Sequence, residues 1–127
     1  MCKRLHLSVL LCAALLPAFA VDAPKDSLKK VKLKGHLVDV SCALEQKDDP
    51  DYMRVKHSKK CFQMPACVKS GYAILTSDDK VIKFDKSGND LAGKLINGTK
   101  KEKDFRITVR GKLSGEELQV SKLELDK

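Results

Sequence analysis

Arginine and aromatic residues are scarce in this sequence of 127 residues, and each scarcity argues against a class of ligand. There is no tryptophan and the aromatic fraction is only 5%, so the stacking platforms that bind single-stranded nucleic acids are largely missing. After residue 20, arginine occurs only at Arg54, Arg106 and Arg110. Lysine supplies most of the positive charge, and it lacks the two-pronged geometry with which arginine recognises phosphate. We therefore expect no specific nucleic-acid binding.

Long apolar runs are also missing, apart from one at the start of the chain. Lys3 and Arg4 precede an apolar run over residues 7–19, which ends in Ala18-Phe19-Ala20. This is the arrangement of a cleaved secretory signal peptide, and the run is shorter than the roughly 20 apolar residues that span a membrane. We therefore predict a signal peptide over residues 1–20, export to the periplasm or outside the cell, and no transmembrane segment in the mature chain.

Removal of the signal peptide leaves residues 21–127, which is enough for one small domain. We expect residues 21–30 to form an exposed basic leader and residues 31–127 to form the domain. Loss of Lys3 and Arg4 lowers the formal net charge from +8 to +6, and such a surface attracts polyanions. An anionic cell-surface polymer or lipid is the expected partner, with a candidate surface formed by Lys83, Arg106, Arg110 and Lys112.

The order of the predicted strands and helices indicates the fold. Strand patterns occupy residues 31–40, 72–76, 81–84, 105–113 and 118–125. Helix signals occupy residues 49–62, a short turn at 65–71, and residues 87–98. A single helix between the third and fourth of five strands is typical of an OB-like barrel. We therefore predict a mainly β fold with minor α content, in which a cysteine-containing helical insertion joins the first two strands; an open α+β sheet is the alternative.

Several short motifs resemble those of a family of small exported bacterial proteins. They are Gly35-x3-Asp39-x2-Cys42, His57-x3-Cys61-x2-Met64-Pro65-x-Cys67, Ser70-Gly71-Tyr72, Lys83-Phe84-Asp85, Gly88-Asn89 and Val109-x-Gly111. The resemblance covers nearly the whole mature chain and implies export, an OB-like core and a shared cysteine segment. It implies no substrate.

Three cysteines remain after export, namely Cys42, Cys61 and Cys67, and in an oxidising compartment one disulfide with one odd thiol is expected. Cys42 ends the first strand, and an antiparallel second strand starting near Tyr72 returns Cys67 to the same edge. We therefore predict a Cys42–Cys67 disulfide, which would stabilise the fold by roughly 3 to 4 kcal/mol. Cys61 is the alternative partner or the free thiol.

The segment HSKKCFQMPAC, residues 57–67, also has a metal-binding interpretation. His57, Cys61 and Met64 fall on one face of a helix if the predicted helix persists that far. Imidazole, thiolate and thioether ligands favour copper, and together with another cysteine they would suit zinc. The simpler alternative makes Met64 a core residue and His57 an exposed or capping residue.

A catalytic interpretation would use Cys61 as a nucleophile and His57 as its base. The sequence identifies no oxyanion donor for this pair, and Asp39 and Asp48 are candidates for an orienting group only because they lie nearby. We therefore predict a non-enzymatic, exported binding module stabilised by a disulfide. The ligand of this module is left open. The alternatives are a copper- or zinc-binding protein and a protein that binds a polyanion or nucleic acid through a basic face of the sheet.

Overall fold

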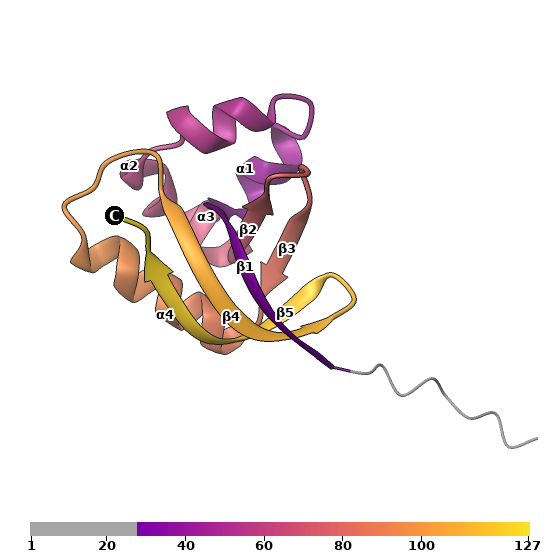
Figure 1. Ribbon diagram of the computed structural model, residues 1–127. Helices are drawn as coiled ribbons and strands as arrows, with labels where there is room; N and C mark the ends of the chain where they lie inside the picture. Colours follow the sequence, from indigo (N-terminus) through magenta and orange to yellow (C-terminus); the bar gives the residue numbers. More distant parts are fainter. Residues whose placement is uncertain (1–27) are drawn as a thin grey trace, which may run out of the picture.

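A closed five-stranded barrel forms the body of the protein in a computed structural model that describes residues 28–127 (Figure 1). The strands are β1 (Lys29–Asp39), β2 (Tyr72–Thr76), β3 (Val81–Phe84), β4 (Arg106–Ser114) and β5 (Glu117–Leu125). They close in the order β1-β2-β3-β5-β4, with β3 and β5 parallel and every other pair antiparallel. This confirms the predicted mainly β, OB-like barrel.

Strand β1 belongs to both halves of the barrel and changes partner near Gly35. Its first part pairs with β4 from Lys29 to His36, and its last part pairs with β2 from Gly35 to Asp39. A Cβ atom at position 35 would lie 2.3 Å from the carbonyl oxygen of Leu75. Only glycine permits that approach. The strand begins at Lys29, within the segment expected to be the basic leader.

The single helix between β3 and β4 is α4 (Lys86–Gly98), as predicted. Asp85 caps it by accepting a hydrogen bond from the Gly88 amide at 2.9 Å. Ala92 and Ile96 are buried on its inner face and close one end of the barrel. The core that they complete also contains Leu37, Phe62, Tyr72, Ile74, Phe84, Phe105, Ile107, Val109, Leu118 and Val120.

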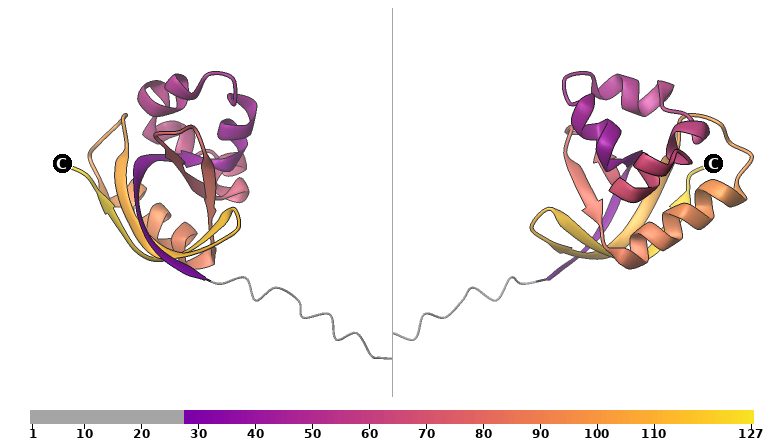
Figure 2. Two further views of the ribbon diagram at one scale, coloured as in Figure 1. Left: turned by 45° about the vertical axis from the view of Figure 1, so that its right-hand side comes forward. Right: turned by 180° about the vertical axis from the view of Figure 1, so that it is seen from behind.

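The insertion between β1 and β2 contains four short helical segments. They are α1 (Val40–Glu45), the π-helical turn η1 (Tyr52–Lys56), α2 (Lys59–Phe62) and α3 (Pro65–Ser70). Figure 2 shows from two sides that these helical segments gather at one end of the barrel. Pro65 opens α3 and Gly71 follows its last residue with a positive φ of 83°, as its sequence predicts.

The prediction of one continuous helix over residues 49–62 is wrong. Asp49 Oδ1 accepts a hydrogen bond from the Tyr52 amide at 3.1 Å, as a cap would, but the helical segment ends at Lys56. His57 is extended, with φ −63° and ψ 125°, and Ser58 caps the separate helix α2. The chain breaks here because the His57 ring is buried against Phe62, with ring centroids 4.3 Å apart.

The insertion covers the outer face of β2, and this contact places the candidate site. All five residues of β2 are buried: Tyr72 and Ile74 face the barrel core, whereas Ala73 and Leu75 pack in a second cluster. The remaining members of that second cluster are Val38, Val40, Ala43 and Met53. The end of β1 and the first part of the insertion are therefore packed against the outer face of β2.

The described residues include no helix long and apolar enough to cross a membrane. The signal peptide predicted for residues 1–20 and most of the predicted leader lie outside the described residues.

Candidate metal centre

Asp39 lies at the point where β1 passes into the insertion. Its side chain is fully buried, and Oδ1 accepts a hydrogen bond from the Cys42 amide at 2.8 Å, so that Asp39 caps α1. On the neighbouring strand its partner is Tyr72, which follows α3 almost directly. The turn at Gly71 thus brings Cys67, on α3, to the same end of the sheet as Asp39 and Cys42.

One donor atom from each of Asp39, Cys42 and Cys67 lies within 4.8 Å of the other two. The two sulfur atoms are 3.9 Å apart and form no disulfide. Asp39 and Cys67 are buried and Cys42 is partly exposed, so the cluster is reached from the Cys42 side. Cys42 and Cys67 therefore lie close together, as predicted. The disulfide between them stays a prediction.

His57 lies behind this cluster and is only 2% exposed. Its Nε2 atom approaches Asp39 Oδ2 to 2.7 Å, within ion-pair distance. The approach lacks hydrogen-bond geometry, and across residues 28–127 neither His57 ring nitrogen nor Asp39 Oδ2 has a hydrogen-bond partner. Buried polar atoms of this kind call for an explanation such as a bound ion or a functional role.

The charge of Asp39 dominates the electrostatics of the cluster. Burial alone would raise the pKa of Asp39, but contact with His57 and the Cys42 amide outweighs burial and leaves the pKa below its ordinary value of 3.8. Burial raises the pKa of Cys42 and of Cys67, and the nearby Asp39 carboxylate raises both further. Without a cation both thiols therefore hold their protons at neutral pH, and as thiols they are poor nucleophiles.

The other predicted ligands do not join the cluster. The helix is interrupted at His57 and again before Pro65. No single helical face therefore aligns His57, Cys61 and Met64, as the metal-binding prediction required. Met64 is 51% exposed, so the alternative core role expected for it is wrong, as is the exposed or capping role expected for His57. Cys61 is partly exposed and lies 3.3 Å from the Ser58 hydroxyl.

Asp39 is indicated by the sequence only as a candidate orienting group for His57, which it does contact, and not as a possible metal ligand. It stands in the segment Gly35-x3-Asp39-x2-Cys42, where a buried strand ends and a cysteine follows three residues later. That position is also what an ordinary helix cap occupies. The signal that separates the two roles is its burial beside His57 and Cys67, which depends on contacts between distant parts of the chain.

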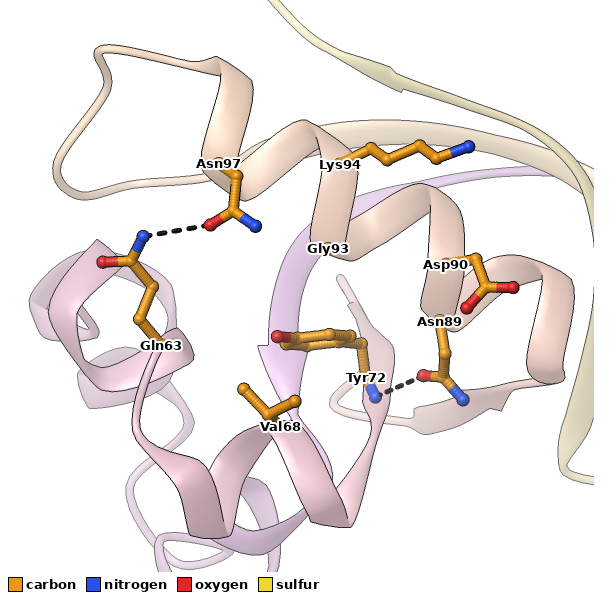
Figure 3. Close-up of a pocket in the computed structure, with 8 residues that line it drawn as sticks. All are labelled: Gln63, Val68, Tyr72, Asn89, Asp90, Gly93, Lys94 and Asn97. Atoms are coloured by element: carbon orange, nitrogen blue, oxygen red, sulfur yellow. Dashed lines mark hydrogen bonds between the residues drawn. The ribbon is translucent and has the colours of Figure 1, made fainter.

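A second concave region is a cleft of about 500 Å³ between α4 and the end of the insertion (Figure 3). Its three amide side chains are engaged by the protein itself: Gln63 donates to Asn97 at 3.1 Å, and Asn89 accepts from the Tyr72 amide at 2.7 Å. The Tyr72 hydroxyl donates to the carbonyl of Phe62 at 3.1 Å. The Gln63–Asn97 bond joins α4 to the insertion, and the two Tyr72 bonds join β2 to α4 and to the insertion. These bonds hold the walls of the cleft together.

The predicted polyanion-binding residues divide between two parts of the barrel. Arg110 and Lys112 lie exposed on β4, and Arg106 lies at the start of the same strand, where its guanidinium contacts Asp104 at 3.2 Å. Lys83 is on β3, which pairs with β2 and β5 and not with β4. The structure therefore separates Lys83 from the other three.

Comparisons with protein-family models, with curated proteins and with solved structures found no match. The resemblance to a family of small exported proteins therefore stays a prediction, and function has to be argued from the site itself.

Proposed function

We propose that this protein is an exported, non-enzymatic binding module whose ligand is a thiophilic metal ion, zinc or copper, held by Asp39, Cys42 and Cys67. The observation that carries the proposal is the convergence of their donor atoms within 4.8 Å. This ligand set replaces the predicted set of His57, Cys61 and Met64. Two thiolates and a carboxylate suit zinc, and the thiolates alone suit copper in its reduced state.

The sulfur separation fits two thiolates on one ion. A Zn–S bond is about 2.3 Å long, and two such bonds at a tetrahedral angle place their sulfurs about 3.8 Å apart. The observed separation of Cys42 Sγ and Cys67 Sγ is 3.9 Å. A metal ion could therefore bind with little movement of the backbone, whereas a disulfide requires the sulfurs to approach to about 2.05 Å.

The surroundings would hold the ligands in place and leave the ion reachable. His57 contacts the outer oxygen of Asp39 and would orient the carboxylate, in the manner of residues that surround metal ligands. Three protein ligands leave one position of a tetrahedral ion free, beside the partly exposed Cys42. An open position is typical of sites that exchange a ligand and atypical of closed structural zinc sites.

Metal titration of the reduced mature protein tests this proposal. We expect one equivalent of Co²⁺, used as a coloured substitute for zinc, to produce a thiolate-to-cobalt charge-transfer band. Cys42→Ser and Cys67→Ser should abolish the band, and the matched control Cys61→Ser should keep it. Because both thiols must lose their protons, binding should weaken as the pH falls. A band that requires Cys61 but not Cys42 would contradict the proposed ligand set.

The second candidate is the disulfide-stabilised module of unknown ligand, and the same pair of cysteines favours it. The intact mass of the exported protein distinguishes the disulfide-stabilised module from the metal centre. The protein should be purified without reductant or chelator and measured both natively and after denaturation. A metal-free protein that lacks the two thiol hydrogens and has one alkylatable cysteine would support the disulfide. A metal adduct that protects the cysteines and is lost on denaturation would support the metal centre.

A further inference from the structure

Cationic side chains stand directly opposite one another across three neighbouring strands of the barrel. Lys32 on β1 pairs with Arg110 on β4, and Arg110 pairs with Lys122 on β5. Two residues away along the same strands, Lys30 pairs with Lys112. All five side chains are exposed, while the residues that alternate with them on β1, such as Val31, face the core. We call Lys30, Lys32, Arg110, Lys112 and Lys122 the basic ladder.

This arrangement opposes the usual pairing of charges on a sheet. Like charges directly opposite one another on adjacent strands are destabilising, whereas opposite charges stabilise the pair. Among residues 28–127, Lys30, Lys32, Arg110 and Lys112 form no ion pair, and Lys122 contacts only Glu124, at 2.9 Å. The fold therefore keeps at least four uncompensated cations together on one face.

The surface of the ladder is hollowed along its length. A groove of about 420 Å³ is lined by Lys30, Arg110 and Lys112 and by no acidic residue. A neighbouring groove of about 510 Å³ is lined by Lys32, Lys34 and Arg110 together with the acidic residues Glu124 and Asp126. Arg110 lines both grooves, so they adjoin at the middle of the ladder. Figure 1 shows the course of β1, β4 and β5, the three strands that carry the ladder and that pair side by side.

We propose that the basic ladder binds a linear, phosphate-bearing polymer. Cations about 5 to 7 Å apart, along and across the strands, match an extended chain of anions better than a single ion. Four of the five charges are lysines, which can donate hydrogen bonds to phosphate in many orientations and require no fixed geometry. Arg110, at the junction of the grooves, supplies the one fork for two-pronged contact.

Other anionic partners fit this face less well. Bases of a nucleic acid need aromatic platforms, and the buried aromatic residues Phe62, Tyr72, Phe84 and Phe105 are unavailable for stacking. An anionic membrane would favour apolar side chains beside the lysines. Of the large exposed apolar residues in the described chain, four lie in the insertion: Leu44, Val55, Met64 and Val68.

Binding of inorganic polyphosphate to the mature protein, measured by calorimetry over a range of NaCl concentrations in the presence of a chelator, tests the proposal. For five contacts, the logarithm of the affinity should fall against the logarithm of salt with a slope of about −3 to −4. The double substitution Lys32→Glu and Arg110→Glu should weaken binding at least about tenfold and make the slope shallower.

The control carries the same change of net charge on the insertion, as Lys60→Glu with Lys69→Glu, where both side chains are exposed. The control should bind polyphosphate like the unmodified protein, and circular dichroism should show that all variants are folded. Equal loss in both double variants, or no binding by the unmodified protein, would overturn the proposal. So would ladder-dependent binding of an oligonucleotide or of phosphatidylglycerol vesicles without binding of polyphosphate. The ladder substitutions lie on β1 and β4, outside the residues of the proposed metal centre, and chelator is present throughout, so the two proposals stand or fall separately.

Discussion

Replacing Asp39 by asparagine would remove a buried charge while keeping the shape of the side chain. Asparagine caps helices about as well as aspartate, so the hydrogen bond from the Cys42 amide to position 39, 2.8 Å long, should survive in Asp39→Asn. The main loss is the contact of the carboxylate with His57, 2.7 Å away and only 2% exposed. The substitution thus tests what that buried contact contributes to stability.

The expected cost is about 3 kcal/mol of unfolding free energy. Leaving a buried polar group without its partner costs about 1 to 3 kcal/mol, and more where a charged group is involved, and the amide can still approach the imidazole, which limits the loss. A domain of this size has a total stability of about 5 to 15 kcal/mol. Asp48→Asn, at an exposed position of the same segment, should change the stability by no more than about 0.5 kcal/mol.

The cost should depend on pH in a definite direction. The pKa of Asp39 is lowered in the folded protein, so the charged carboxylate contributes stability above its unfolded pKa and loses that contribution as the pH falls through the folded value. The difference between the unmodified protein and Asp39→Asn should therefore shrink as the pH falls below the ordinary aspartate pKa of 3.8.

Urea denaturation followed by circular dichroism is the suitable assay, because the protein has no tryptophan. Reductant and chelator should be present so that neither a disulfide nor a metal ion contributes. A cost below about 1 kcal/mol, or a cost that stays constant down to about pH 3, would refute the reasoning about the buried pair.

Further substitutions test the packing of the barrel by the same denaturation assay. Gly35→Ala should lower the unfolding free energy by at least about 2 kcal/mol, because its Cβ would meet the Leu75 carbonyl at 2.3 Å. Gly93→Ala, with open space around its Cβ in α4, should raise the unfolding free energy by about 0.5 to 1 kcal/mol. Equal effects of the two substitutions would contradict the argument. Phe62→Ala should cost about 3 to 5 kcal/mol, since the ring is fully buried against His57 and Phe105; a loss no larger than that of Met64→Ala would contradict its place in the core. Asn89→Ala should cost about 1 to 3 kcal/mol by leaving the Tyr72 amide and the Phe84 carbonyl without their side-chain partner, and an unchanged midpoint would show that these bonds contribute nothing.

The sequence was sufficient for the barrel because its turns are well marked. The strands expected at residues 72–76 and 81–84 have the same bounds in the structure, and α4 occupies the predicted interval. Polar turn residues and glycines separate the apolar stretches, and these signals act locally along the chain. Periodicity and punctuation together therefore indicated the number, order and type of the elements that form the barrel.

The candidate site was harder to predict because its residues are placed by distant contacts. His57 follows an apparently helical stretch, yet the chain leaves the helix there to bury the ring against Phe62 and beside Asp39. The local signal of that break is Ser58, a residue type preferred at helix starts, which caps α2. The proximity of Cys42 and Cys67 could be predicted, since it follows from the antiparallel pairing of β1 with β2, which is itself a property of the barrel.

Asp39 connects the stability of the fold to the proposed metal centre, because one carboxylate caps α1, contacts His57 and faces both thiols. An ion bound there would bind the folded chain and stabilise it by mass action. Zinc held at 100 times its dissociation constant should raise the unfolding free energy by about 2.7 kcal/mol, provided that the unfolded chain does not bind it. Cys61→Ser should keep this gain, whereas Cys42→Ser should lose it. A gain that survives Cys42→Ser would place the ion elsewhere and leave the buried Asp39–His57 contact a purely structural one.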